Sequence, residues 1–222
     1  ELKKNNLSGY LVPRSDVHQG EYVAACDERL SWLTGFTGSA GICIVGNNRA
    51  GVFVDGRYSI QAKKQTKSPI EVTQWNKKNF LQWIEKNIVR GEIGFDPWLH
   101  SHKEIVELSE AFADKDIGFL PYDNLIDKVW LTRPLKVSSR ATSYPYKLSG
   151  LSAKDKCQQI AEIIKFKKAD AAVITLPDSI AWLLNLRGND VIHNPILHAF
   201  LIINNKGKIE LFYKNENISN SI

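Results

Sequence analysis

Short apolar runs separated by polar turns dominate the first half of the chain. The runs Ile42–Val45 and Val52–Val54 flank Asn47, Asn48 and Arg49, and this spacing predicts a β-hairpin. Other runs of four to seven residues carry apolar side chains at strand spacing and end at turn residues. They predict further strands over residues 9–13, 69–75, 92–95 and 117–120.

Apolar residues at helical spacing alternate with these strands. Asn79–Val89 places Phe80, Trp83 and Ile84 on one stripe, which predicts an amphipathic helix. The pair Ser101-x-x-Glu104 has the spacing of a capping box and predicts a helix start. Shorter helical patterns begin near residues 27, 58 and 124. Strands and helices in alternation predict an α/β layered domain around a mixed sheet.

The pattern of apolar residues changes after residue 132. Residues 133–149 contain Pro134 and Pro145 and few periodic apolar residues, which predicts a linker. A second capping box, Ser152-x-x-Asp155, then predicts a helix to about residue 168. A buried strand over residues 171–176, a short helix over 178–184 and a hairpin over 199–213 are expected to follow.

The second part of the chain repeats the first. Residues 27–38 align with residues 178–188, and each segment leads to a hairpin whose turn contains an Asn pair. The second copy carries an insertion, Asn189–Pro195. Trp32 and Trp182 occupy equivalent positions and are both predicted to anchor a core. Internal similarity of this kind predicts two tandem copies of one α/β unit, each a mixed sheet flanked by helices. The expected division is 1–132, a linker at 133–149, and 150–222.

Composition fits a globular protein without membrane spans. The 222 residues are 43% hydrophobic and 24% charged, and no apolar run approaches the roughly 20 residues of a spanning helix. Residues 1–7 lack the apolar core of a signal peptide, and the missing initiator Met is expected of a processed or trimmed chain. Cys26, Cys43 and Cys157 are odd in number and widely spaced, which predicts free thiols, a buried one at Cys43, and a reducing cytoplasm.

The net charge of +5 is spread along the chain rather than concentrated. Lysine pairs fall mostly on predicted helices with acidic neighbours, which is typical of solvated helix faces. A nucleic-acid surface would need clustered basic residues interleaved with aromatic ones. We therefore expect neither a nucleic acid nor a membrane as a partner.

The glycine-rich stretch Gly38–Gly41 invites a comparison with catalytic and phosphate-binding loops. Phosphate loops follow a strand and precede a helix, whereas this stretch follows a helical pattern and precedes a strand. A nucleophile elbow would need glycine where Thr37 stands. The glycines are therefore predicted to permit a tight helix-to-strand turn.

No metal-ligand set is apparent among the five histidines. Asp16 and His18 are ligands by type, but they have no firm third partner, so a hydrogen-bonded loop is favoured. His100 and His102 stand at a predicted helix start, where their side chains diverge, and surface or capping roles are favoured. The sequence predicts no metal site and no catalytic residue in this chain.

Four motifs, in order along the chain, resemble one known family. They are D-x-R-x-x-W-L-T-G-F-T-G-S-A-G at residues 27–41, DGRY at 55–58, LIDKVW at 125–130 followed by Arg133-Pro134, and IAWLLNLRGNDVIHNP at 180–195. The chain resembles the two N-terminal domains of the three-domain cytosolic aminopeptidase P proteins, Xaa-Pro aminopeptidases of the creatinase/prolidase superfamily. The resemblance implies two tandem creatinase N-terminal-type domains, the second of which could be truncated.

The resemblance places the chemistry of the family outside this sequence. In that family a C-terminal pita-bread domain holds a dinuclear metal centre, usually manganese, with two Asp, one His and two Glu. A metal-bridging hydroxide attacks the peptide bond before proline. This sequence ends before any such domain, and we expect it to be inactive alone.

The resemblance also implies candidate binding residues. Arg57, in the DGRY motif, matches a position that helps to bind the substrate peptide at the active-site entrance, and a fixed guanidinium suits a peptide carbonyl or carboxylate. An ion pair with Asp55 is the alternative. Arg187 and His193 lie in a loop placed to border the missing domain, although His193 before Asn194 could equally form a rigid turn.

The function implied is that of a non-catalytic part of a cytoplasmic, homodimeric Xaa-Pro aminopeptidase. It would shape substrate access for peptides with proline second and supply dimer contacts. The alternative is a peptide- or protein-binding module of a chaperone-like pita-bread relative that has lost its metal ligands.

Overall fold

The computed structural model describes residues 1–214, which form two compact units. The first unit contains residues 1–17 and 26–134, and the second contains residues 18–25 together with the chain from residue 135 onward. The segment 18–25 therefore belongs to the second unit, although it lies between a strand and a helix of the first. Hydrophobic pattern alone gave no sign of this assignment.

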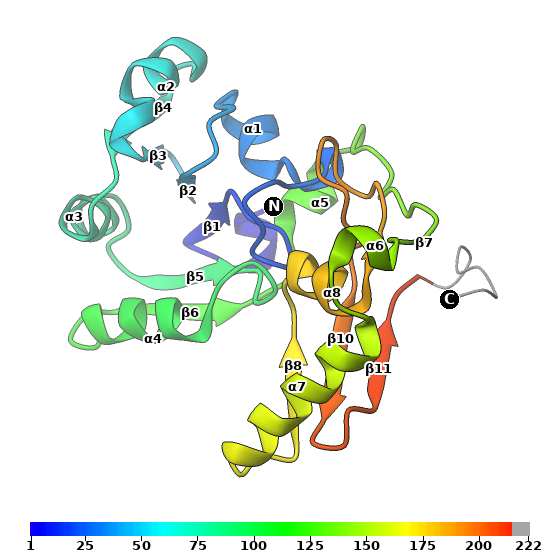
Figure 1. Ribbon diagram of the computed structural model, residues 1–222. Helices are drawn as coiled ribbons and strands as arrows, with labels where there is room; N and C mark the ends of the chain where they lie inside the picture. The colour runs from blue at the N-terminus through cyan, green and yellow to red at the C-terminus, as the bar shows by residue number, and fades with distance from the viewer. Residues whose placement is uncertain (215–222) are drawn as a thin grey trace. The chain divides into compact units, whose positions relative to one another are not determined.

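The first unit is built on one mixed six-stranded sheet (Figure 1). Its strands are β1 (Gly9–Pro13), β2 (Gly41–Gly46), β3 (Ala50–Val54), β4 (Ile70–Gln74), β5 (Gly91–Phe95) and β6 (Ile117–Pro121). The order is β4-β3-β2-β1-β5-β6, with β1, β5 and β6 parallel to one another, β3 parallel to β4, and β2 antiparallel to both its neighbours. The predicted mixed sheet is confirmed.

Helices connect these strands and cover both faces of the sheet. They are α1 (Arg29–Thr34), α2 (Ser59–Gln65), α3 (Lys77–Asn87), α4 (His102–Ala111) and α5 (Leu125–Val129), with short 3-10 helices η1 (Lys3–Asn5), η2 (Ala25–Asp27) and η3 (Gly56–Tyr58). The predicted helix start at Ser101 is confirmed, since the Ser101 hydroxyl caps α4 by accepting the Glu104 N–H at 3.2 Å.

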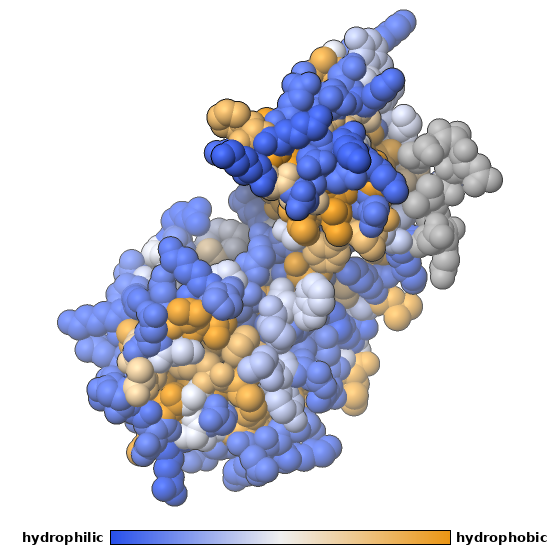
Figure 2. Space-filling model, turned by 90° about the horizontal axis from the view of Figure 1, so that it is seen from below, coloured by the Kyte–Doolittle hydropathy of each residue, from blue (hydrophilic) through white to orange (hydrophobic). Residues whose placement is uncertain are grey.

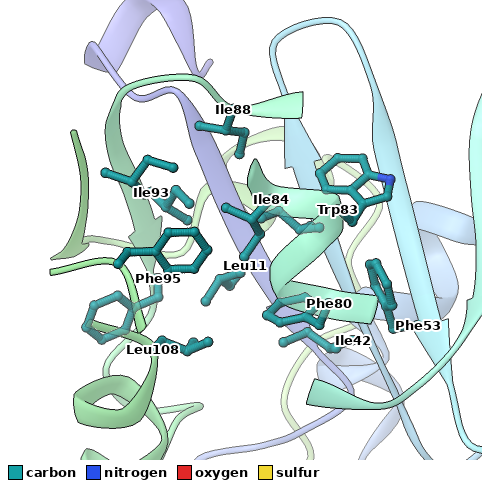
Figure 3. Close-up of a cluster of buried hydrophobic side chains, with 13 residues drawn as sticks. Leu11, Ile42, Phe53, Phe80, Trp83, Ile84, Ile88, Ile93, Phe95 and Leu108 are labelled. Carbon is teal, nitrogen blue, oxygen red and sulfur yellow. The ribbon is translucent and has the colours of Figure 1, made fainter. Parts of the chain in front are cut away.

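Two hydrophobic layers hold the sheet and helices together. On one face, α3 and α4 pack on β1, β2, β3 and β5 (Figure 3), where the Phe80 and Trp83 rings meet Phe53 edge-on. On the other face, α1, α2 and α5 cover Tyr10, Val12 and neighbouring strand residues. Removing this much apolar surface from water is the main stabilising term of the unit.

The second unit is a smaller α/β layer. Its elements are β7 (Thr142–Ser143), α6 (Tyr146–Ser149), α7 (Ala153–Phe166), β8 (Ala171–Ile174), α8 (Pro177–Leu184), β9 (Leu186–Arg187), β10 (Phe200–Asn204) and β11 (Ile209–Phe212). Strands β11, β10 and β8 form an antiparallel sheet, and β7 pairs with β9. One face of the antiparallel sheet packs on α7 and α8.

The internal repeat is visible in the structure. The order β1, α1, β2, β3 of the first unit recurs as β8, α8, β10, β11, with the same antiparallel pairing of the three strands. Helices α1 and α8 also end alike, because Gly35 and Asn185 both adopt the left-handed conformation at the helix C-terminus. Glycine and asparagine tolerate that conformation best.

Two expectations about burial were wrong. Strand β8 is not buried, because only one of its faces is covered and Val173 is 68% exposed. Trp32 and Trp182 are not core anchors, since they are 40% and 50% exposed. Trp32 instead stacks on Trp130 at a centroid distance of 5.5 Å. Ala141, within the residues 133–149 that were predicted to be a linker, is buried in a small cluster of the second unit.

The surface mixes polar and apolar residues. Figure 2 shows hydrophobic residues reaching the surface among hydrophilic ones on the face in view. Among residues 1–214, no helix has the length and apolar character needed to cross a membrane.

Candidate functional site

The polar turns of the first unit lie together at one end of the strands of the six-stranded sheet. The register pairs Val54 with Gln74 and Phe95 with Pro121, so β3, β4, β5 and β6 all end there, as does the parallel strand β1. We call this the carboxyl edge. In open α/β sheets, ligands bind preferentially outside the carboxyl ends of the strands.

Arg57 lies at the carboxyl edge, in the turn that follows β3. The turn is η3, and its N-cap is Asp55, whose Oδ1 accepts the backbone N–H of Arg57 at 2.9 Å. The same oxygen accepts the guanidinium Nε–H at 2.8 Å. The Arg57 side chain is 71% exposed. Both the predicted rim position and the alternative pairing with Asp55 are therefore observed.

The hydrogen bonds from Arg57 lower the pKa of Asp55 below its ordinary value. The bond from the guanidinium is the largest cause and the bond from the backbone N–H is the next. Asp55 therefore keeps its charge in mildly acidic solution and continues to orient the guanidinium. The arrangement presents a fixed cation at the surface, which suits a carboxylate or a peptide carbonyl.

Tyr58 joins the Arg57 turn to the glycine-rich turn. Its hydroxyl lies 2.7 Å from the Ser39 Oγ, and this hydrogen bond is the main reason that the pKa of Tyr58 is lowered. The Tyr58 ring also meets Phe36 edge-on at 5.7 Å and lies 5.4 Å from the Arg57 guanidinium carbon. A Cβ at Gly38 would collide with the rings of Phe36 and Tyr58. The glycine is required here by close ring packing, a reason that the sequence did not reveal.

Side-chain amides of helix α2 make a second connection to the glycine-rich turn. Gln65 accepts the backbone N–H of Thr37 at 3.0 Å and donates to the Thr37 Oγ1 at 2.9 Å, and Gln61 donates to the same hydroxyl at 3.1 Å. Helix α2 is thereby fixed to the glycine turn. These contacts join the two turns around Arg57.

Sequence reasoning missed an ion-pair network in the first unit. Arg29 donates from Nε to Asp127 at 2.7 Å and from Nη1 to Asp27 at 2.8 Å. Arg133 contacts the same two carboxylates, at 2.6 Å and 3.3 Å. The Arg29–Asp127 and Arg133–Asp27 contacts join residues 98 and 106 positions apart and tie the start of α1 to the end of the unit. The DxR and LIDKVW motifs contain three of them, but spacing alone did not show that they meet.

Arg187 has a local structural role in the second unit. Its Nη1 donates to the carbonyl oxygens of Ala181 at 3.0 Å and Leu186 at 2.7 Å, where helix α8 ends. The guanidinium carbon lies 4.2 Å from the Tyr144 ring. A cation beside the last carbonyls of a helix is favourable.

His193 lies in an exposed turn, with a left-handed φ of 62°. The neighbouring anchor is Asp190, which is 4% exposed. Its Oδ1 accepts from the N–H and hydroxyl of Ser139, at 2.6 and 2.7 Å, and its Oδ2 accepts the His198 N–H at 2.8 Å. Arg187 is held at the end of α8 and His193 lies in an exposed turn, so the structure does not group these two candidates into one site.

Of the other histidines, His100 was predicted wrongly and His18 correctly. His100 is not at the surface, since its side chain is fully buried, with Nδ1 3.2 Å from the Glu104 Oε1. His18 is 4% exposed, stacks on His198 at 4.9 Å, and has Nδ1 2.9 Å from the Thr175 carbonyl oxygen. It belongs to a packed loop, as the sequence favoured.

The described residues do not fit the dinuclear metal centre that the resemblance implies. In residues 1–214, no group of three or more His, Cys, Asp or Glu side chains is placed to hold a metal ion. No step of a metal-dependent reaction is therefore assigned to these residues.

The chain is similar to two family models and to several known proteins. Two models of the creatinase/prolidase N-terminal domain match the chain, at residues 1–129 and 132–222. The chain is 34% identical over 226 residues to a probable Xaa-Pro aminopeptidase P of Talaromyces stipitatus and 34% identical over 220 residues to aminopeptidase P2 of Arabidopsis thaliana. These matches cover 98% and 96% of this chain, but 34% and 31% of the relatives.

A solved structure shows the same fold. The X-prolyl aminopeptidase of Caenorhabditis elegans, a cytosolic enzyme with a di-nuclear active site, matches 96% of this chain with a TM-score of 0.89 and 31% identity. The match covers 36% of that enzyme. The chain thus spans about a third of the length of these relatives. It belongs to the creatinase/prolidase N-terminal domain family, which it matches twice in tandem.

Proposed function

We propose that this chain forms the N-terminal, non-catalytic part of a metal-dependent Xaa-Pro aminopeptidase. Such an enzyme removes the first residue from peptides that carry proline second. The observation that carries the proposal is the match to the Caenorhabditis elegans X-prolyl aminopeptidase, with a TM-score of 0.89 over 96% of the chain. The relatives from Talaromyces stipitatus and Arabidopsis thaliana, both aminopeptidases P by name, support it.

The proposal assigns different tasks to different parts of the full polypeptide. A catalytic domain outside this sequence holds the metal pair, proposed to be manganese, and hydrolyses the peptide bond. The two units described above narrow the access to that domain and contribute to a cytoplasmic homodimer.

Within the first unit, Arg57 is the residue that we propose contacts the peptide. Its guanidinium is exposed at the carboxyl edge, is oriented by Asp55, and stands on a surface made rigid by Tyr58 and Gln65. A rigid cation loses little conformational entropy when it binds a carbonyl or a carboxylate.

The first experiment tests the division of labour. The 222-residue chain, incubated with Ala-Pro-Ala and Mn²⁺, should release no alanine, whereas the full polypeptide should release it. Release of alanine by the short chain would contradict the proposal. Peptide binding without hydrolysis by the full polypeptide would favour the chaperone-like alternative.

The second experiment tests Arg57 in the full polypeptide. Loss of a hydrogen bond to a charged group costs about 1.5–3 kcal/mol, so Arg57→Ala should raise KM roughly tenfold or more while kcat and metal content stay unchanged. Arg49→Ala is the matched control, because Arg49 is similarly exposed and pairs with Glu71 at the opposite end of β3. Equal kinetics for both variants would remove Arg57 from the proposal.

A further inference from the structure

A pocket opens at the end of the sheet opposite to the carboxyl edge, where β3 and β5 begin. It has a volume of about 370 Å³, which is in the range of small-ligand pockets. Its lining comes from Ser8 before β1, from the hairpin turn 47–49, and from residues 86–90 at the end of α3 and before β5. Arg49 and Arg57 flank β3 at its opposite ends, so the pocket is separate from the Arg57 turn.

The backbone on both sides of this pocket is held by hydrogen bonds. The Ile88 N–H donates to the Ile84 carbonyl oxygen at 2.8 Å, which extends the order of α3 into the lining. Ile88 itself is 3% exposed and belongs to the hydrophobic cluster of Figure 3. On the hairpin side, the Gly46 N–H donates to the Arg49 carbonyl oxygen at 2.8 Å and closes the turn. The polar side chains of the pocket therefore project from ordered backbone.

The lining formed by the described residues carries positive charge and no carboxylate. Its cations are Arg49, Lys86 and Arg90. The Glu71 Oε1 lies 3.0 Å from the Arg49 Nη1 and balances that arginine, so we assign Arg49 no role in binding. Lys86 and Arg90 are both exposed, and neither makes an ion pair within residues 1–214. Two positive charges of the lining are therefore without a counter-charge from the described chain.

Carboxylates that are close in sequence to the two cations are directed elsewhere. Glu85 precedes Lys86, but its carboxylate lies 4.0 Å from the Lys115 Nζ. Glu92 follows Arg90 by two positions, but its carboxylate lies beside β6. The positive charge of the pocket is thus not removed by these neighbours.

The two unbalanced cations fit one phosphate group. A phosphate monoester carries about −1.5 to −2 charges at pH 7 and three strong acceptor oxygens. An arginine can bind it through two parallel N–H groups, and a lysine adds a point charge. The exposed side chains of Asn47 and Asn48 add amide N–H donors on the hairpin side. A nucleotide fits less well, because the described lining has no aromatic side chain on which a base could stack.

We propose that this pocket binds a phosphate monoester, with Lys86 and Arg90 as the residues that contact the phosphate. The bound phosphate supplies the counter-charge that the described chain lacks there. The site lies at the other end of β3 from Arg57 and uses no catalytic domain, so it does not depend on the function proposed above.

The experiment follows the amide signals of residues 47, 48 and 90 in the ¹⁵N-labelled 222-residue chain during titration at low salt. The probes are acetyl-Ala-X-Ala-amide peptides, with phosphoserine, aspartate or serine as X, and inorganic phosphate. The phosphoserine peptide should give a saturable shift with Kd on the order of 1 mM. The aspartate peptide should bind at least about fivefold more weakly, because it carries a single charge, and the serine peptide should give no shift.

Inorganic phosphate distinguishes two sources of the same chemistry. If it binds as tightly as the phosphoserine peptide or more tightly, the pocket is a site for small phosphates. If the peptide binds more tightly, the pocket is a site for phosphorylated side chains. The absence of a saturable shift with either phosphate probe would overturn the proposal.

Variants separate this pocket from general attraction to a basic surface. Lys86→Gln and Arg90→Gln should each weaken phosphate binding about fivefold. Lys78→Gln is the matched control, because Lys78 is an exposed lysine near the other end of α3 and makes no ion pair among the described residues. It should leave the Kd unchanged. An equal effect of Lys78→Gln, or equal binding of the phosphoserine and serine peptides, would also overturn the proposal.

Discussion

Asp55 holds Arg57 through a single carboxylate oxygen, which accepts the guanidinium Nε–H at 2.8 Å and the backbone N–H at 2.9 Å. The carboxylate therefore caps the turn and orients the arginine at the same time. The backbone contact fixes the turn, and the guanidinium contact gives the exposed side chain a preferred direction.

The pKa of Asp55 should depend on Arg57. It lies below the ordinary value of 3.8 because Arg57 stabilises the charged form. A lowered native pKa stabilises the folded chain above pH 3.8, and this contribution is lost as the pH falls through the lowered pKa. In Arg57→Ala, NMR titration of the Asp55 carboxyl should show a pKa closer to 3.8, whereas Arg49→Ala should not move it. An unchanged pKa in Arg57→Ala would contradict the assigned cause.

Arg29 should contribute far more to stability than an exposed arginine. Its side chain is 6% exposed and its partners are Asp27 and Asp127. Breaking a buried ion pair from one side typically costs about 3–5 kcal/mol, and the lower end of this range is expected here because Arg133 still contacts both carboxylates. Urea unfolding of Arg29→Met should show a loss of this size. Arg49→Met, which breaks the exposed pair with Glu71, should cost less than about 1 kcal/mol. Similar losses of unfolding free energy in both variants would contradict the larger contribution expected of Arg29.

Gly35 and Gly150 separate the cost of a steric clash from the cost of a left-handed backbone conformation. Gly35 and Gly150 both have a left-handed φ, of 81° and 75°. A Cβ at Gly35 would lie 2.8 Å from the Gln65 carbonyl oxygen, whereas nothing lies within 4 Å of a Cβ at Gly150. Gly150→Ala should therefore cost about 1 kcal/mol, the penalty of the conformation alone. Gly35→Ala should cost more, because helix α2 must also move. Equal shifts of the thermal midpoint in Gly35→Ala and Gly150→Ala would contradict the expected clash with the Gln65 carbonyl oxygen.

Lys156 should make the second unit more stable at high pH. It is 2% exposed, and its ammonium donates to the Trp182 carbonyl oxygen at 2.8 Å and the Asn185 Oδ1 at 2.7 Å. Burial lowers its pKa below 10.5, and the positive charge of Arg187 lowers it further. Between the lowered pKa and 10.5 the unfolded chain binds more protons, so stability rises with pH in that window.

Arg187→Met tests whether the positive charge of Arg187 contributes to the lowered pKa of Lys156. NMR titration of the Lys156 side chain should give a pKa closer to 10.5 in this variant, because one positive charge has been removed. Lys156→Met should remove the rise in stability from the same pH window. A flat stability profile in the unchanged protein would contradict the direction of the shift.

Local signals explain why the elements could be predicted. The Ser101 and Ser152 caps are observed, with the Ser152 Oγ accepting the Asp155 N–H at 3.1 Å, because a cap needs only residues three positions apart. The hairpins at Asn47 and Asn204 form for the same reason. The rim position of Arg57 followed from a strand that ends in Asp-Gly.

Long-range packing explains what was missed. The hydrophobicity of Trp32 does not reveal that its ring would stack on Trp130 at a partly exposed position. The pairing of Arg29 with Asp127 joins residues 98 positions apart, and no periodic pattern encodes such a contact.

The amino-acid sequence by itself determined the strands, the helices, their caps and the repeated order of elements, since these depend on contacts between near neighbours. The tertiary structure decided which charges are buried together, which tryptophans remain exposed and which turns share the carboxyl edge. Those outcomes depend on how the sheet brings distant segments side by side, and pairing of that kind is a property of the folded chain as a whole.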